Sequence, residues 1–224
     1  MSFPIAILAS GNGTNAQAMI DKMQAGILDI DIVLIASNNP QAKVLERAQK
    51  AGIAHLVLDH HTFQKREQYD QALLASVLEH KAQAVVLAGY MRLLSGSFLK
   101  GFPGQVLNLH PALLPSFPGL HGARDAMDYG VKLTGATVHF VNEIMDNGPV
   151  IIQAAVPVKD GEDEEALLTR IHAMEHRIYP QAVQWLATGR LSLNGRRVAL
   201  ASATIAKAPA PEAALIWPPL EAGF

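Results

Sequence analysis

The stretch that decides the fold is residues 5–16, which run Ile5-Ala6-Ile7-Leu8-Ala9-Ser10-Gly11-Asn12-Gly13-Thr14-Asn15-Ala16. Its opening run of apolar residues predicts a short strand that is buried on both faces. The glycines allow a tight turn, and residues 15–25 then have a helical pattern with Gly26 as a plausible stop. A buried strand, a glycine turn and a helix in this order are the first half of a βαβ unit.

The same alternation continues along the N-terminal half. Further apolar runs of strand length are 30–36, 56–58, 84–88 and 106–109, and helical patterns cover 42–51 and 62–80. Strands that are apolar throughout are typical of parallel sheets with helices on both faces. We therefore expect an α/β fold with a doubly wound, mostly parallel sheet.

The C-terminal half has a different pattern. Residues 133–141 and 150–158 are longer apolar runs joined by a short polar turn, which predicts an antiparallel strand pair. A long helix is expected over 163–188, with acidic residues in its first turn, where the helix dipole favours them. We expect a single domain over residues 1–200 and an Ala- and Pro-rich tail over 201–224 that is loosely packed or disordered.

Composition excludes several classes of protein. Of 224 residues, 50% are hydrophobic, and 18 Lys and Arg face 20 Asp and Glu. This balance suggests no nucleic-acid partner, and no apolar run reaches the roughly 18 residues of a membrane span. The N-terminus has no basic region before its apolar run, so we expect no cleaved signal peptide. The absence of cysteine excludes disulfides, thiolate nucleophiles and Cys-ligated metals. Taken together, these features lead us to expect a cytoplasmic globular protein.

Ligands of parallel sheets bind at the carboxyl ends of the strands, and the loop over residues 10–16 lies at such an end. The start of the following helix offers backbone N–H groups and the positive end of a dipole, which suit an anion such as phosphate. The spacing is close to a dinucleotide fingerprint. That fingerprint needs an acidic residue closing the second strand, where residues 37–39 are Ser-Asn-Asn. A single phosphate is therefore favoured, and an ordinary glycine-rich turn is the alternative.

Asn108 and His110 follow the fifth expected strand on one side of the chain. An amide beside an imidazole is a candidate oxyanion clamp, and histidine also moves protons near neutral pH. A structural pair is the alternative. The proline- and glycine-rich residues 111–122 predict either a rigid pocket wall or a plain connection. Asp146, in the turn between the two late strands, either makes an Asx-turn or brings a carboxylate near His110.

Metal and nucleophile patterns are weak. His60 and His61 are adjacent, and adjacent side chains are expected to diverge. His172 and His176 have a zinc-compatible spacing but no H-E-x-x-H pattern, so we expect no metal. No G-x-S-x-G elbow is present.

Five segments in order match one family: S-G-N-G-T-N (10–15), A-G-Y-M-R-L-L (88–94), N-L-H-P-A-L-L-P-S-F-P-G (108–119), D-N-G-P (146–149) and E-H-R-I-Y-P (175–180). Over roughly residues 5–200 the chain resembles the phosphoribosylglycinamide formyltransferases, folate-dependent enzymes of purine biosynthesis. The N-x-H-P-x-L-L-P block is shared among formyl-folate transferases. The loop over residues 10–15 and the P-G-L-H segment (118–121) narrow the resemblance from the formyl-folate transferases in general to those that act on glycinamide ribonucleotide. The chain departs from the family pattern at Thr14, where serine is usual, at Asn147, where glycine is usual, and at His172, where Gln or Lys is common.

The resemblance implies the formyltransferase fold, with a phosphate-binding N-terminal half and a folate and catalytic C-terminal half. It implies transfer of formyl from the co-substrate 10-formyltetrahydrofolate to the amine of glycinamide ribonucleotide, by direct attack through a tetrahedral intermediate and without metal. Asn108 and His110 would stabilise the oxyanion, while Asp146 would orient His110 and keep it charged. The residues implied for nucleotide binding are Gly13, Thr14, Asn15, His172 and Glu175. Those implied for folate binding are Arg66, Met91, Arg92, Leu93, Leu94 and Asn108.

Two classes of alternative stay open. A formyltetrahydrofolate hydrolase or a methionyl-tRNA formyltransferase usually carries an extra domain, which we do not expect here. A non-catalytic nucleotide-binding protein would need the phosphate loop but not Asn108, His110 and Asp146 together. We expect small-molecule substrates, no nucleic-acid or membrane partner, and a monomer or homodimer.

Overall fold

Parallel strands form the core of the N-terminal part of the computed structural model, which describes residues 2–202 and 214–224. The chain divides into two compact units, residues 1–108 and 109–224. In the first, strands pair in the order β3-β2-β1-β4-β5, all parallel. The strands are β1 (Phe3–Leu8), β2 (Ile30–Ser37), β3 (His55–Val57), β4 (Ala84–Leu87) and β5 (Val106–His110). Every residue of β4 is buried, as its unbroken apolar run requires.

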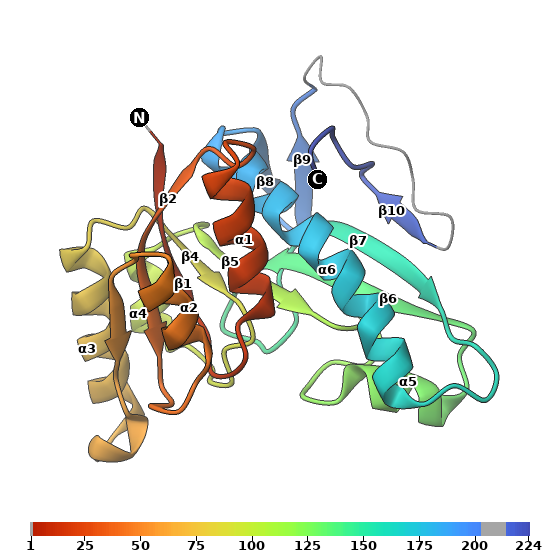
Figure 1. Ribbon diagram of the computed structural model, residues 1–224, viewed down its shortest axis with the longest axis horizontal. Coiled ribbons are helices and arrows are strands. Elements are labelled where there is room, and N and C mark those ends of the chain that lie inside the picture. The colour runs from red at the N-terminus through yellow and green to blue at the C-terminus, as the bar shows by residue number, and fades with distance from the viewer. Residues whose placement is uncertain (1, 203–213) are drawn as a thin grey trace. The chain divides into compact units, whose positions relative to one another are not determined.

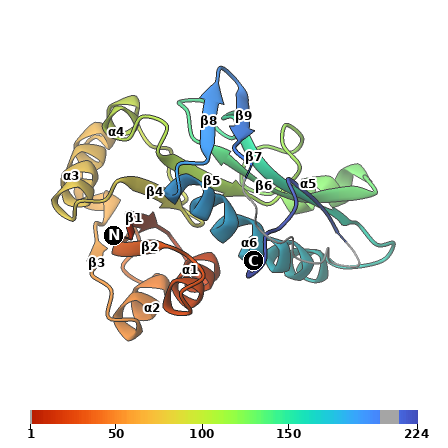
Figure 2. The ribbon, with the colours of Figure 1, turned by 90° about the horizontal axis from the view of Figure 1, so that it is seen from above.

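Helices cover both faces of this parallel sheet. Figure 2 shows α1 (Thr14–Gln24) and α2 (Val44–Lys50) on one side, with α3 (Arg66–Glu79) and α4 (Gly96–Gly101) on the other. A 3-10 turn, η1 (His60–Thr62), precedes α3. It forms because the Asp59 side chain accepts a hydrogen bond from the His61 backbone N–H. The helix predicted from residue 62 therefore begins only at Arg66.

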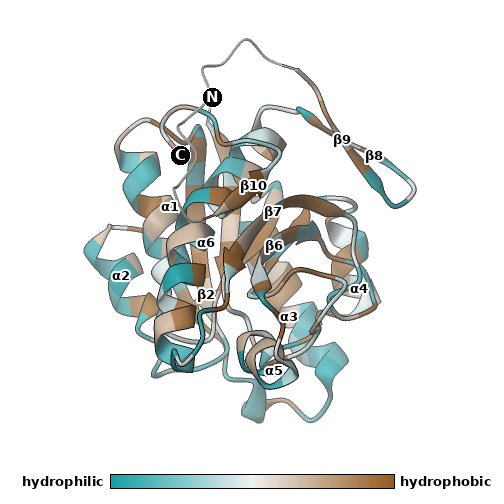
Figure 3. Ribbon diagram, turned by 90° about the vertical axis from the view of Figure 1, so that its right-hand side faces the viewer, coloured by the Kyte–Doolittle hydropathy of each residue, from teal (hydrophilic) through white to brown (hydrophobic). Residues whose placement is uncertain are grey.

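The second unit contains an antiparallel sheet in the order β6-β7-β10. β6 (Leu133–Phe140) pairs with β7 (Val150–Pro157), and β10 (Leu215–Trp217) pairs with the other edge of β7. α6 (Glu164–Ala187) packs on β6 and β7, and α5 (Gly122–Tyr129) contacts α6 (Figure 1). Figure 3 shows β6 and β7 as hydrophobic strands, in agreement with the burial of most of their residues.

The expected α/β class is confirmed, with its mostly parallel strands and an antiparallel pair in the C-terminal half. Three further elements were not predicted from the sequence: α4, α5 and the hairpin of β8 (Leu191–Asn194) and β9 (Arg197–Leu200). No helix among the described residues is long and apolar enough to cross a membrane.

The tail differs from the loosely packed extension expected over 201–224. Ile216 and Leu220 are buried, and β10 forms backbone hydrogen bonds with β7. Burial of these apolar side chains and pairing with an open strand edge stabilise the segment, which a composition argument does not foresee. Residues 203–213 of the expected tail lie outside the described part of the chain. The single domain over residues 1–200 stays a prediction.

Candidate active site

The glycine-rich loop of the first unit presents the start of α1. Gly13 has a φ of 69° and precedes the first residue of the helix. No side chain caps this helix start, and its first turn carries no acidic residue. A Cβ on Gly13 would lie 2.5 Å from Cγ2 of Val44, so α2 approaches the loop too closely for any other residue. The backbone N–H groups of Thr14 and Asn15 thus begin a helix whose dipole favours an anion.

Two side chains brace this loop, Arg47 from α2 and Ser10 from within the loop itself. Nε of Arg47 donates to the Asn12 carbonyl oxygen at 2.7 Å, and Nη1 donates to Oε1 of Gln17 at 3.1 Å. Oγ of Ser10 donates to Oδ1 of Asn38 at 2.5 Å and accepts from the Met91 backbone N–H at 2.8 Å. Sequence reasoning missed Arg47, since one arginine in an amphipathic helix gives no local signal. The Ser10 bond connects the phosphate loop to the 90–94 segment expected to bind folate.

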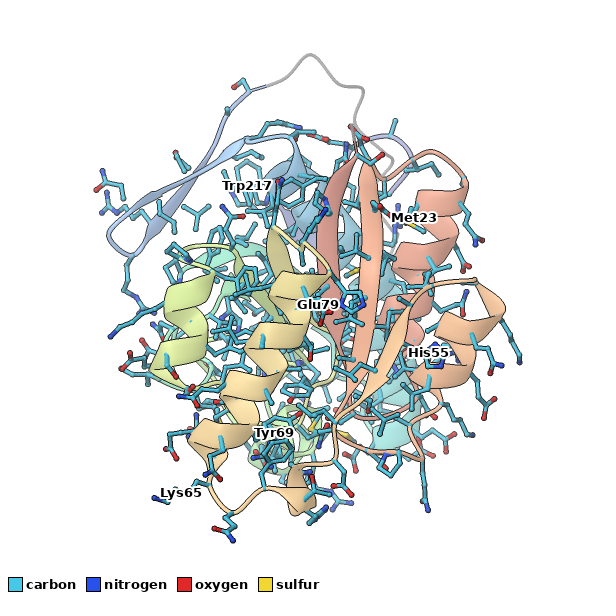
Figure 4. All side chains as sticks on the ribbon, turned by 90° about the vertical axis from the view of Figure 1, so that its left-hand side faces the viewer. Met23, His55, Lys65, Tyr69, Glu79 and Trp217 are labelled. Atoms are coloured by element: carbon cyan, nitrogen blue, oxygen red, sulfur yellow. The ribbon has the colours of Figure 1, made fainter. Side chains whose placement is uncertain are left out.

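The 90–94 segment combines exposed and buried side chains. Met91 and Leu93 are exposed, while Leu94 is buried. The Arg92 guanidinium lies 4.8 Å above the ring of Tyr69, a residue of α3 labelled in Figure 4. The exposed apolar side chains beside a fixed cation suit a flat heteroaromatic ligand.

A tyrosine pair supports this segment from α3. The hydroxyls of Tyr69 and Tyr90 lie 2.6 Å apart, and burial raises the pKa of both. Both hydroxyls therefore stay neutral at physiological pH. Arg66 begins α3, and its Nε lies 3.8 Å from Oδ2 of the buried Asp70, which also accepts from the Ser95 backbone N–H at 2.7 Å.

In the second unit, His110 and Asp146 lie together. Nδ1 of His110 is 3.5 Å from Oδ2 of Asp146, and the side chains are only 4% and 9% exposed. The Gly119 N–H donates to the same carboxylate oxygen at 2.8 Å. The other ring nitrogen of His110 lies 2.7 Å from the Phe117 carbonyl oxygen. Both ring nitrogens of His110 thus face oxygen acceptors.

A second histidine, which sequence reasoning missed, faces the other carboxylate oxygen. Nε2 of His139 lies 3.9 Å from Oδ1 of Asp146, and the His139 side chain is 2% exposed. Its Nδ1 lies 2.8 Å from the Phe140 carbonyl oxygen. Burial holds the pKa of His139 below its usual value, so the ring is neutral near pH 7. A lone histidine in an apolar strand has the same pattern as a core residue, and nothing in the sequence marked it.

Asn108 lies two residues before His110 on β5, on the same side of that strand, and is partly buried. On α6, Nε2 of His172 and Oε2 of Glu175 lie 4.0 Å apart. The carboxylate is buried and the imidazole is about half exposed. The structure therefore brings together the two residues of α6 expected to contact the nucleotide.

The two adjacent histidines differ from expectation. His60 and His61 do not diverge, because the tight 3-10 turn brings their ring centroids to 3.8 Å. Among the described residues, one donor atom each of Asp59, His60 and His61 lie within 4.8 Å of one another. The Asp59 carboxylate already accepts from N and Nδ1 of His61 at 2.9 Å, and the backbone bond lowers its pKa most. These bonds account for the cluster without a cation.

Comparisons with known proteins show the family to which the chain belongs. Residues 4–183 match the family model described as Formyl transferase. The phosphoribosylglycinamide formyltransferase of Escherichia coli (strain K12) is 43% identical over 190 residues, which are 85% of this chain and 90% of that protein. The Bacillus subtilis (strain 168) enzyme of the same name is 37% identical over 191 residues, or 85% and 96%. A crystal structure of glycinamide ribonucleotide transformylase 1 from Symbiobacterium toebii superposes with a TM-score of 0.89 at 45% identity, over 90% of this chain and 95% of that one. The chain therefore belongs to the formyl transferase family, among its phosphoribosylglycinamide formyltransferases.

Proposed function

We propose that this protein transfers the formyl group of 10-formyltetrahydrofolate to the amine of glycinamide ribonucleotide, a step of purine biosynthesis. The observation that carries the proposal is the buried His110–Asp146 pair at the end of the strand that holds Asn108. Membership of the family indicates the substrates, and the His110–Asp146 pair provides side chains that can act on the formyl group. The co-substrate brings an activated formyl carbon. The residues of the chain bind the two substrates, stabilise the oxyanion and move the proton.

Asn108 and His110 act on the formyl oxygen. As the amine attacks the carbon, negative charge develops on this oxygen, and the Asn108 amide and a His110 N–H donate to it. Positioned donors of this kind contribute about 3–4 kcal/mol each to the stability of a transition state. For His110 Nε2, the substrate oxygen replaces the Phe117 carbonyl as acceptor.

Asp146 orients the His110 ring and favours its charged form. The Gly119 N–H holds one carboxylate oxygen in place, so the acid faces the imidazole in a fixed direction. A water molecule held by Asp146 shuttles the proton that the amine loses to the folate nitrogen. The bond between this protonated nitrogen and the formyl carbon then breaks, the carbonyl re-forms, and tetrahydrofolate leaves. No covalent acyl-enzyme is required, because the amine attacks the formyl carbon directly.

Substrate contacts follow from the remaining residues. Backbone N–H groups of Gly13, Thr14 and Asn15 bind the nucleotide phosphate, and His172 with Glu175 binds its ribose or glycinamide part. The folate is bound by Arg66, Met91, Arg92, Leu93, Leu94 and Asn108, with Arg66 pairing with its glutamate carboxylate. The protein acts in the cytoplasm as a monomer or homodimer.

One assay separates this proposal from its alternatives. Purified protein should consume 10-formyltetrahydrofolate only when glycinamide ribonucleotide is present, and formylated amine should accumulate in equal amount. Consumption without the amine, with release of formate, would identify a hydrolase. Transfer only to methionyl-tRNA would identify the tRNA enzyme, and no consumption with either acceptor would leave a nucleotide-binding protein.

A further inference from the structure

The turn that carries Asp146 is held by a hairpin from much later in the chain. β8 and β9 pair through a two-residue turn, Gly195 and Arg196. Figure 2 shows this hairpin beside β7, which β9 contacts. Nη1 of Arg196 donates to the carbonyl oxygen of Asn147 and to its Oδ1, both at 2.8 Å. One guanidinium nitrogen thus binds the residue that directly follows Asp146.

The hairpin is a firm support for this arginine. A two-residue turn with Gly195 at a φ of 59° fixes the direction of the tip. At the hairpin base, Nε of Arg190 donates to the Ala201 carbonyl oxygen at 3.1 Å. Nη1 of Arg190 pairs with Oε1 of Glu221 at 2.7 Å, and these two side chains are only 14% and 12% exposed. Arg196 therefore projects from an element that is fixed at its base.

The backbone of the turn carries the Asp146 carboxylate, so contacts that restrain this backbone bear on the direction of the carboxylate. Asp146 has a φ of 50°, in the left-handed region that residues with a side chain adopt less readily than glycine. The Asn147 carbonyl oxygen also accepts from Nδ2 of Asn142 at 3.2 Å. Two donors, one from the turn and one from the hairpin, thus restrain the peptide between residues 147 and 148, one residue beyond the carboxylate that faces His110.

We propose that Arg196 is a positioning residue for Asp146, which it holds toward His110 through the Asn147 peptide. This inference rests on the proposed function for its effect on rate, while the contact itself can be tested without substrate. Because the bonds are exposed, each has a modest net strength, and their loss is expected to weaken the alignment without removing the catalytic groups. Arg196 does not touch the reacting atoms.

The test compares Arg196→Ala, Asn147→Ala and a matched control, Arg197→Ala, which removes the neighbouring exposed arginine of β9. Formyl transfer rates, melting temperature and amide hydrogen exchange over residues 142–148 are measured for each. Arg196→Ala should lower kcat about two- to tenfold with little change in KM. It should also speed exchange of the Asn147 amide, which donates to the Ile144 carbonyl oxygen. Asn147→Ala should have a smaller but measurable effect on kcat and exchange, because it removes one of the two Arg196 bonds while the main-chain oxygen keeps the other. Arg197→Ala should match the wild type.

Equal rates and equal exchange in Arg196→Ala and Arg197→Ala would overturn the proposal. A lower melting temperature in Arg196→Ala would mean that this variant also destabilises the hairpin. Asn147→Ala is then the deciding variant, because it leaves the hairpin unchanged. Normal exchange and normal kcat in Asn147→Ala would overturn the proposal as well. A wild-type protein that transfers no formyl group would refute the proposed function. Exchange in the turn would still report whether Arg196 holds it.

Discussion

At the scale of single residues, the account rests on His110. His110→Asn keeps a polar side chain but removes the ring that we propose donates to the formyl oxygen. We expect kcat to fall by about 100-fold or more, with KM for both substrates changed little. His55→Asn is the control, because His55 is an exposed histidine of β3 without a proposed role (Figure 4). A His110→Asn rate within about twofold of the wild type would remove His110 from the mechanism.

His139 makes stability depend on pH. Burial lowers its pKa in the folded state, so the unfolded chain takes up a proton first as pH falls. The contribution to stability is complete above the unfolded pKa of about 6.5 and is lost as pH falls through the folded value. Urea unfolding between pH 7.5 and 5 should show a falling free energy of unfolding. His139→Asn should be less stable at pH 7.5 but flatter across this range, and an unchanged slope would contradict the assignment.

The residue types of the candidate site could be predicted from the sequence, but the contacts between distant residues could not. Asn108 and His110 are two residues apart on a strand, so their common side follows from strand geometry. The approach of Asp146 to His110 depends on the positive φ of Asp146 and on the Gly119 N–H, neither of which a pattern reveals. His139 and Arg47 act through tertiary contacts alone and could not be singled out.

At the scale of elements, the loop over residues 10–16, which we propose binds the nucleotide phosphate, depends on Gly13. Gly13→Ala forces a side chain into a positive φ and against Val44, so we expect lower stability and weaker binding of glycinamide ribonucleotide. Gly11→Ala is a matched control in the same loop, because a Cβ there meets nothing within 4 Å and its φ is ordinary. Calorimetric titration with the nucleotide and thermal unfolding would measure both effects. Equal affinity in the two variants would contradict the role given to this turn.

Elements with an unbroken apolar run or a long helical pattern were predicted to within about two residues, since burial and periodicity decide them. The exception is the start of α3, which was expected at residue 62 and lies at Arg66 because η1 precedes it. The helix expected over 163–188 is α6, and the antiparallel pair is β6 and β7. α4 was missed because it has only 6 residues, and α5 because its first residue is a glycine that follows a proline-rich loop. β10 was missed because a strand of 3 residues depends on the edge that β7 offers.

At the scale of the whole molecule, the C-terminal segment contributes to the stability of the second unit. Glu221→Ala leaves the buried Arg190 guanidinium without its carboxylate, which should cost about 2 kcal/mol of unfolding free energy. Asp160→Ala breaks the solvent-exposed pair with Lys132 and should change stability little. Urea unfolding of both variants measures the difference. Equal stabilities would show that the C-terminal segment contributes nothing through this pair.

The central claim is direct transfer of one formyl group between two small molecules. The most direct test supplies 10-formyltetrahydrofolate labelled with ¹³C in the formyl group, together with unlabelled formate and glycinamide ribonucleotide, and follows the product by mass spectrometry. Direct transfer predicts that the formylated amine carries the label in full and that His110→Asn forms it far more slowly. Unlabelled product, or labelled formate in place of labelled product, would contradict the account.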